Sequence, residues 1–498
     1  MKQVKIDGDN LTLEDVQAVA LHGAKVRIHP KAAAKIKKCR KFVKKIVDTG
    51  QTVYGINTGF GSLCNKRISK KDIEKLQENL IVSHALSVGP VFSEEEVRAI
   101  MLLRANVLAK GFSGVRLELI QTLVEMINKR VHPMIPEKGS VGASGDLAPL
   151  AFMALPLVGK GWVFYQGRLM EGKKAFRKAG VSPLKVSSKE GLALINGTCV
   201  MTAIGVLTLL KAERLAELAD MAGAMSLEAA LCTPTAFDPN VQKVRKHKGQ
   251  RKSADNLVNL TRGSQIREFH KACPKVQDPY SFRCMPQVHG AIRDTFSYIR
   301  SVLEIEINSA TDNPLIFPDE NKVISAGNFH GEPVALGLDF LSIAISELAS
   351  ISERRIAALI NPATSGLPAA LTAKPGLNSG FMMAQIVAAS LVSENKCLTH
   401  PASVDSIPTS MDQEDHVSMG TIAARKAREV VNNTEDVLAI EFLAASQGID
   451  FRSPLKPGIG TGKIHQQIRK RILPVTKDRL LVLDLVKIKE LMRRGFEI

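Results

Sequence analysis

The chain has 498 residues, of which 45% are hydrophobic and 23% are charged. These fractions are close to those of ordinary globular proteins, so they exclude a disordered or fibrous chain. Lys and Arg outnumber Asp and Glu by 67 to 49, which gives a formal net charge of +18 and requires a nucleic-acid partner to be considered.

The basic residues do not form a pattern typical of nucleic-acid binding. In a dense basic stretch, residues 31–45, Lys is interspersed with Ala and Ile as in an amphipathic helix. Aromatic residues, which stack on bases, make up only 5% of the chain. We therefore expect solvated helix faces and no nucleic-acid partner. A basic helical nucleic-acid-binding protein is the non-enzyme alternative.

The cysteines and the N-terminus predict a cytoplasmic protein. The seven cysteines are scattered without a Cys-x-x-Cys pair, and no His-Glu-x-x-His motif occurs, so neither a disulfide framework nor a metal site is predicted. The N-terminus lacks the apolar segment of a signal peptide. Residues 191–210 carry no formal charge, but Asn196, Thr198 and Thr202 interrupt them, which favours a core helix over a membrane span.

Turn signals and helical periodicity divide the chain into two expected regions. The first 110 residues contain short mixed elements, separated by turns such as Asp7-Gly8 and Gly89-Pro90. Beyond them, apolar residues recur at helical spacing. This predicts helices over residues 95–109, 115–130, 200–231, 301 onward, 334–360, 381–393 and 421–447. Residues 234–263 are predicted to form an exposed loop or a helical hairpin, and Gly448 is predicted to cap the last of these helices.

Several of these helices exceed 20 residues and are apolar on more than one face. This is typical of helices that are buried among other helices or subunits. The predicted fold is therefore mainly α, with a smaller mixed region over residues 1–110 and a long-helix bundle over residues 111–498.

A loop of small residues, Ala143-Ser144-Gly145, has an unusual chemical potential. If the loop is held bent, the Gly145 nitrogen, unhindered by a Cβ, can attack the Ala143 carbonyl carbon. Loss of two water molecules, one of them from the Ser144 hydroxyl, then leaves a five-membered ring with an exposed methylidene carbon. Such a ring is a strong electrophile that requires no added cofactor. Taken alone, however, three small residues more often form an ordinary turn.

The longer string 142–150, GASGDLAPL, resembles the signature of the aromatic amino acid ammonia-lyases, whose prosthetic group is 4-methylideneimidazol-5-one. The resemblance extends over nearly the whole chain and is strongest with the histidine-specific members. Further strings match in the order of the family: YGINTGFG at 54–61, INGT at 195–198, QDPYSFR at 277–283, GNFHGEP at 327–333 and QEDHVSM at 413–419.

The resemblance assigns the proton transfers to tyrosine. Tyr54 is the expected base for the Cβ proton, and Tyr280 lies in a second matching block and is expected to be catalytic as well. A phenol has a pKa of about 10, so Tyr54 must be ionised by nearby positive potential before it can act.

Other matching positions are expected to hold the substrate. The planar guanidinium of Arg283 can bind both oxygens of the substrate carboxylate. Asn196 is expected near that carboxylate and Gln287 near the electrophile. Gln277 and Phe329 lie in the matching blocks and are expected to line the same site.

Two positions favour an imidazole substrate. An imidazole needs polar partners, whereas a phenyl ring would leave them unpaired at a cost of about 1–3 kcal/mol each. His84 and Glu414 supply such partners, and the phenylalanine and tyrosine enzymes of the family typically have Gln where Glu414 stands. His84 alone is ambiguous, because a histidine there can also bind a tyrosine hydroxyl. Met285 and the pair Met411-Asp412 depart from the usual pattern and leave fine substrate preference open.

By resemblance, the reaction converts L-histidine to trans-urocanate and ammonia, the first step of histidine degradation. The implied fold is the helical one shared with fumarase and aspartase, in a homotetramer whose sites draw residues from several subunits. The alternatives within the family are a tyrosine or phenylalanine ammonia-lyase, and a 2,3-aminomutase that returns the amine to Cβ.

Overall fold

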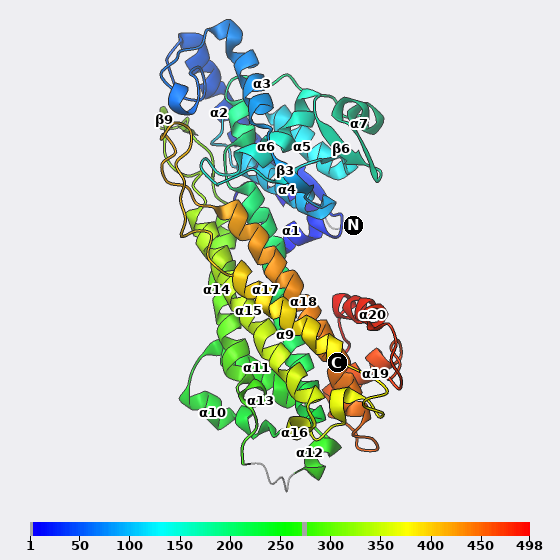
Figure 1. Ribbon diagram of the computed structural model, residues 1–498. Helices are drawn as coiled ribbons and strands as arrows, with labels where there is room; N and C mark the ends of the chain where they lie inside the picture. The colour runs from blue at the N-terminus through cyan, green and yellow to red at the C-terminus, as the bar shows by residue number, and fades with distance from the viewer. Residues whose placement is uncertain (1–2, 271–275) are drawn as a thin grey trace. The chain divides into compact units, whose positions relative to one another are not determined.

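The computed structural model describes residues 3–270 and 276–498, and most of them are helical (Figure 1). The chain divides into two compact units. Unit 1 comprises residues 1–208, 300–339 and 401–425, and unit 2 comprises residues 209–299, 340–400 and 426–498. The expected boundary at residue 110 falls inside unit 1.

Unit 1 combines short helices with small sheets. Its helices are α1 (Leu13–Ala20), α2 (Pro30–Thr49), α3 (Ile73–His84), α4 (Glu94–Ala109), α5 (Leu117–Lys129), α6 (Leu147–Ala154), α7 (Gly172–Ala179) and α8 (Glu190–Ile195). Strands β1 (Gln3–Ile6) and β2 (Lys25–Ile28) are parallel, whereas β3 (Val88–Val91) pairs antiparallel with β5 (Pro136–Lys138). Strands β4 (His132–Pro133), β6 (Trp162–Tyr165) and β7 (Arg168–Glu171) form an antiparallel sheet, and β8 (Leu315–Phe317) pairs antiparallel with β9 (Lys322–Ile324).

Four long helices contribute residues to both units: α9 (Cys199–Ala229), α14 (Met285–Glu306), α15 (Glu332–Ile360) and α18 (Gly420–Asp450). The remaining α-helices lie in unit 2: α10 (Pro239–Val244), α11 (Lys248–Leu260), α12 (Gln265–Phe269), α13 (Tyr280–Arg283), α16 (Pro362–Ser365), α17 (Met382–Leu398), α19 (Ile459–Arg469) and α20 (Leu481–Arg494). Helices α10 and α11 confirm the helical hairpin expected within residues 234–263.

The core of unit 2 is built where α15, α17 and α18 run side by side (Figure 1). Ile356, Ala388 and Val437 meet there with no side-chain surface exposed. A fully buried ion pair lies within the same unit: Arg355 Nε is 2.6 Å from Glu441 Oε1. Hydroxyl groups from α9 and α15 complete the coordination of this carboxylate. The predicted bundle of long, widely apolar helices is confirmed.

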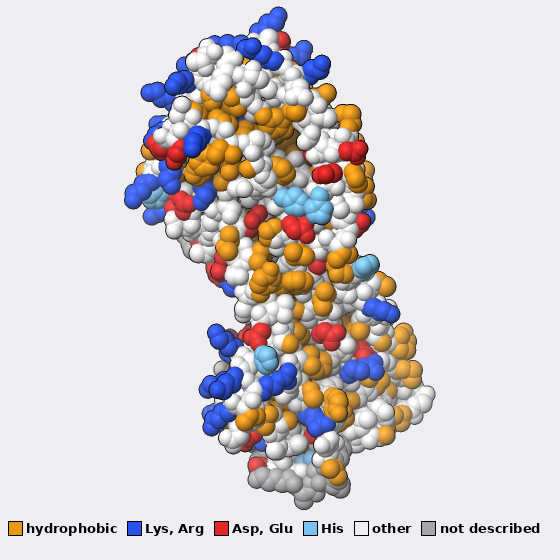
Figure 2. Space-filling view, turned by 90° about the vertical axis from the view of Figure 1, so that its left-hand side faces the viewer, with side chains coloured by type: hydrophobic (Ala, Val, Ile, Leu, Met, Phe, Trp, Pro, Cys, Tyr) orange, Lys and Arg blue, Asp and Glu red, His pale blue; other side chains and the backbone are white. Residues whose placement is uncertain are grey.

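Helix α2 confirms the solvated basic face. Its buried residues are Ala32, Ile36, Cys39, Val43 and Ile46, which share one face, while every Lys between positions 31 and 45 is exposed. On the face drawn in Figure 2, Lys and Arg lie among acidic and apolar side chains at several separate places.

Two glycines lie inside the helices whose predicted bounds were wrong. Helix α14 begins at Met285, well before residue 301, and helix α18 continues through Gly448 to Asp450. A Cβ on Gly290 would lie 2.2 Å from the Gln250 nitrogen, and one on Gly448 would lie 2.8 Å from the Ala229 Cβ. Both glycines therefore permit close packing between segments, so neither interrupts or caps its helix.

Two apolar stretches bear on the membrane question. The uncharged residues 191–210 are not one helix, because α8 ends at Ile195 and α9 begins at Cys199. Among the described residues, α15 alone is long and apolar enough to cross a membrane, and 61% of its most apolar window is buried inside the structure. Burial of this kind is also found in the core helix of a helical bundle.

Candidate active site

The Ala143-Ser144-Gly145 loop is bent at both ends. Gly142 and Gly145 have φ values of +75° and +73°, which favour glycine. A Cβ on Gly145 would lie 2.2 Å from the Gly197 carbonyl oxygen, so the loop approaches its neighbour too closely for any other residue. The Ser144 side chain faces a cavity of about 1110 Å³. A loop held bent around an unhindered glycine nitrogen is the condition for forming 4-methylideneimidazol-5-one, so these residues fit the group.

Asp146 anchors this loop from the protein interior. Its Oδ2 accepts hydrogen bonds from the Val200 and Met201 nitrogens at the start of α9, at 2.7 and 3.1 Å. Its Oδ1 accepts one from Thr421 Oγ1, at 2.6 Å. Burial raises the pKa of this carboxyl to about 6, although the three donors favour the charged form. The carboxylate thus ties the loop to the first turns of α9 and α18.

Asn196 lies beside the loop, in the break between α8 and α9. Its side chain is 3% exposed and lines the cavity. Its Nδ2 donates to Asp312 Oδ1 at 3.3 Å, and the other oxygen of Asp312 lies 2.8 Å from Lys189 Nζ. The Asn196 carbonyl accepts a hydrogen bond from Arg104 at 2.7 Å. Hydrogen bonds therefore fix both the backbone and the side chain of Asn196.

Glu414 also lines the cavity and contacts the loop through Ser144. Its Oε1 accepts a hydrogen bond from Ser144 Oγ at 3.1 Å, and its Oε2 accepts one from Thr409 Oγ1 at 2.8 Å. Residues 409 and 414 also form an antiparallel backbone bridge, so Glu414 is the last residue of a tight turn. The unusual residues Met411 and Asp412 lie in this turn with positive φ, and both are exposed.

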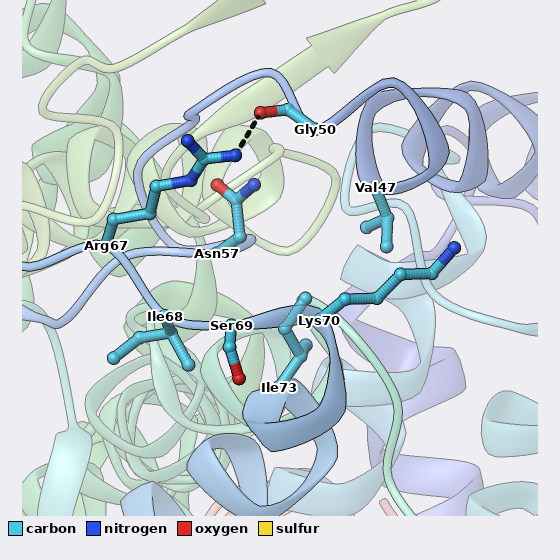
Figure 3. A pocket seen from close by; sticks show the side chains of 8 residues that line it. All are labelled: Val47, Gly50, Asn57, Arg67, Ile68, Ser69, Lys70 and Ile73. Carbon is cyan, nitrogen blue, oxygen red and sulfur yellow. Dashed lines mark hydrogen bonds between the residues drawn. The ribbon is translucent and has the colours of Figure 1, made fainter.

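Tyr54 lies in the loop between Gly50 and Arg67, and a hydrogen bond joins these two residues. Arg67 donates a hydrogen bond to the Gly50 carbonyl at 2.9 Å, at the edge of a smaller cavity of about 390 Å³ (Figure 3). The Tyr54 hydroxyl lines the larger cavity and accepts a hydrogen bond from the Gly61 nitrogen at 3.4 Å. Burial raises the pKa of Tyr54, and the Glu414 charge acts in the same direction. Lys66 lines the same cavity, but the net shift of the Tyr54 pKa is upward, so the ionised form expected of Tyr54 is not favoured in this single chain.

His84 and Phe329 also line the larger cavity. His84 ends α3, and its Nδ1 lies 3.0 Å from Ser83 Oγ. Burial lowers the pKa of the imidazole, while the Glu414 charge opposes that shift. The cavity wall therefore brings together the predicted residues Tyr54, His84, Ala143, Ser144, Asn196, Phe329 and Glu414.

The other predicted residues lie elsewhere in the chain. Gln277, Tyr280, Arg283 and Gln287 belong to unit 2, and none of them lines this cavity. Tyr280 is 70% exposed, and the Arg283 guanidinium lies 4.6 Å from the centre of its ring. Arg283 Nε and Gln287 Oε1 are buried without a hydrogen-bond partner in the structure.

Comparisons with known proteins identify the family. Residues 11–470 match the family model described as aromatic amino acid lyase. The chain belongs to the aromatic amino acid lyase family. It is 57% identical to the histidine ammonia-lyase of Caldanaerobacter subterraneus subsp. tengcongensis, an alignment that covers 99% of this chain and 97% of the relative.

Solved structures of aromatic amino acid lyase relatives share the fold. The crystal structure of histidine ammonia-lyase from Trypanosoma cruzi has a TM-score of 0.92 and 44% identity, over 99% of this chain and 94% of the other. Tyrosine aminomutase from Streptomyces globisporus has a TM-score of 0.93 and 38% identity, over 99% and 97%. The predicted fumarase- and aspartase-like helical fold is thereby confirmed, and so is the family.

Three residues that hold the site were not singled out from the sequence. Lys189 and Asp312 pair across 123 positions, and Thr409 contacts Glu414 from within the same turn. No spacing rule joins two residues so far apart as Lys189 and Asp312. For Thr409, a hydroxyl five positions before the predicted site residue Glu414 was the one available signal.

Proposed function

We propose that this chain is a cytoplasmic enzyme that converts L-histidine to trans-urocanate and ammonia. The observation that carries the proposal is the 3.1 Å hydrogen bond from Ser144 Oγ to Glu414 Oε1, in a cavity that Tyr54 and His84 also line. The tripeptide that defines the reaction and the carboxylate that favours histidine therefore share one site.

The tripeptide would carry 4-methylideneimidazol-5-one, which supplies an electrophilic carbon without an external cofactor. Asn196, whose amide is fixed by Asp312, is placed to bind a polar group of the substrate. Phe329 gives the cavity wall an apolar surface for the substrate ring. Tyr54 would remove a proton from the substrate Cβ once its hydroxyl is ionised.

We propose that the charge which ionises Tyr54 comes from a neighbouring subunit of a homotetramer. Burial raises the pKa of Tyr54, and Lys66, which lines the same cavity, does not reverse that shift. Arg283 lies in unit 2 with an unpartnered buried nitrogen, beside the exposed ring of Tyr280. A site completed by a second copy would give Arg283, Tyr280, Gln277 and Gln287 the roles expected of them, with the substrate carboxylate bound by Arg283.

Substrate choice depends on His84 and Glu414. Either group can hydrogen-bond an imidazole, whereas a phenyl ring offers neither group a hydrogen-bond partner. The high identity to a histidine ammonia-lyase supports histidine. The fold alone does not decide, because a tyrosine aminomutase is equally similar in shape.

The test incubates the protein with L-histidine, L-tyrosine or L-phenylalanine. Ultraviolet absorbance detects the conjugated acrylate product, and NMR identifies each product. Histidine alone is expected to give a rapid rise, with urocanate as the product. A rise with tyrosine and none with histidine would overturn the substrate assignment. A product that retains its amine at Cβ would show an aminomutase instead.

A further inference from the structure

Three side chains that the proposed reaction does not use lie close together, and the two histidines among them line the same cavity. They are His330, Glu332 and His416, and all three belong to unit 1. One ligand-type atom from each lies within 4.8 Å of the other two. Histidine and acidic side chains are also seen next to each other on the surface in Figure 2.

The two imidazoles are already arranged as a pair. Their rings are stacked, with centroids 5.8 Å apart and planes 8° apart. His330 Nδ1 accepts a hydrogen bond from the Glu332 nitrogen at 3.3 Å, and this contact holds the ring over the first turn of α15. His330 Nε2 lies 3.3 Å from the His416 carbonyl oxygen. The backbone thus orients one imidazole, while the His416 side chain is exposed.

One carboxylate oxygen in this cluster lacks a hydrogen-bond partner. Glu332 Oε2 is buried and accepts no hydrogen bond in the structure. A buried carboxylate oxygen without a donor costs free energy, and a nearby cation would remove that cost. This unpartnered oxygen is independent of the two imidazoles and points to a positively charged ligand.

We propose that His330, Glu332 and His416 bind a divalent transition-metal ion of the zinc type. Two imidazole nitrogens and one carboxylate oxygen are ligands that zinc prefers, and three protein ligands leave one position open to water. Tetrahedral ligand atoms at bond lengths of about 2.0–2.1 Å lie about 3.3 Å apart. The atoms of this cluster must therefore approach one another further, through rotation of the His416 side chain, and His330 must release one of its two backbone contacts to offer a free ring nitrogen.

The ion would join two segments that carry predicted site residues. His330 follows Phe329 directly, and His416 lies two positions after Glu414. Both histidines line the cavity into which Ser144 faces. A bound ion therefore cross-links the turn before α15 to the loop that carries Glu414, and it stabilises the folded chain by an amount that rises with the logarithm of the ion concentration above Kd.

The sequence predicted no metal site, because it contains no compact ligand motif. His330 and His416 are 86 positions apart and meet only in the folded chain. Since none of the three ligands has a role in the proposed deamination, the site stands whether or not the chain acts on histidine.

The experiment is a titration of the full-length protein with Co²⁺, which reports its ligands through visible absorption. The protein is first treated with EDTA and dialysed into histidine-free buffer, since free histidine chelates the ion. The variants are Glu332→Gln and His416→Ala. The matched controls are Asp415→Asn, an exposed carboxylate beside His416, and His22→Ala, an exposed histidine outside the cluster.

The wild type and both controls are expected to bind one Co²⁺ per chain with a tetrahedral spectrum, and Zn²⁺ should displace it. Each cluster variant should bind at least about tenfold more weakly. Unchanged binding in both variants, a thiolate charge-transfer band, or no binding by the wild type would each overturn the proposal. Circular dichroism checks folding; if His416→Ala does not fold, the nearly isosteric Glu332→Gln decides.

Discussion

Asn196 Nδ2 donates a hydrogen bond to Asp312 Oδ1, and the remaining oxygen of Asp312 pairs with Lys189 Nζ at 2.8 Å. Lys189 and Asp312 are both fully buried at their side chains. This chain of contacts fixes an amide on the cavity wall by means of a buried ion pair, so changes at Asp312 should affect both folding and the site.

Replacing Asp312 by Ala should destabilise unit 1, because the Lys189 ammonium is left buried without its partner. Loss of one partner of a buried pair typically costs about 3–5 kcal/mol, and burial already lowers the pKa of this lysine. Urea unfolding measures the loss. The control Asp255→Asn removes an exposed pair with Arg251 and should leave the unfolding midpoint unchanged. An unaffected Asp312→Ala midpoint would show that the ion pair is not important for stability.

Glu414→Gln should reduce activity on histidine while preserving the fold. The amide retains a hydrogen-bonding oxygen for Thr409 but loses the negative charge next to Ser144. Loss of a group that transfers or stabilises a proton typically lowers the rate by about 10²–10⁴-fold. Steady-state kinetics with separate kcat and KM values measures the effect. Wild-type kinetics in this variant would show that the Glu414 charge has no role in the reaction.

Gly145→Ala should prevent formation of the electrophile. Its Cβ would lie 2.2 Å from the Gly197 carbonyl oxygen, at a φ of +73° that disfavours alanine. Gly167→Ala is a matched control, because Gly167 has a φ of +71° and open space around it. Intact-protein mass spectrometry should find wild-type and Gly167→Ala chains two water molecules lighter than their sequences. The same loss in Gly145→Ala would contradict the role of this close contact.

Stability should fall as the pH is lowered from about 6.5 to about 4, with His132 as one identifiable contributor. Burial, followed by the Arg98 and Arg130 charges, lowers the pKa of His132 to about 4, although Glu94 lies 3.1 Å from its Nδ1. In this window the unfolded chain binds a proton that the folded chain does not, so unfolding is favoured by up to about 3 kcal/mol.

Urea unfolding at a series of pH values checks this contribution. His132→Gln removes the titrating group and should flatten the dependence between pH 6.5 and 4. A slope as steep as that of the wild type would assign the acid sensitivity to other groups.

The sequence was informative where function rests on contiguous residues. The strings around Tyr54, Ser144 and Glu414 were recognised because each is held within a single loop, and the helices were located by their apolar period. The end of α18 was placed too early, because Gly448 serves close packing, which a single sequence does not distinguish from a helix cap.

Contacts between distant positions could not be predicted. Asp312 supports Asn196 from 116 positions away, and His330 meets His416 only because two loops converge. The ionised state expected of Tyr54 is a similar case, since its surroundings within this chain raise its pKa. Such relationships depend on the folded chain and, as we propose for Arg283, on neighbouring copies.

The most direct test of the proposed reaction compares wild-type protein and Ser144→Ala in the conversion of L-histidine to urocanate. Alanine removes only the hydroxyl that must leave to form the electrophile, and Ser144 is a partly exposed loop residue, so the fold should persist. Circular dichroism checks that it does. The wild type should produce trans-urocanate and ammonia in equal amounts, and Ser144→Ala should produce neither. Urocanate formation by Ser144→Ala at the wild-type rate, or none by the wild type, would contradict the proposal.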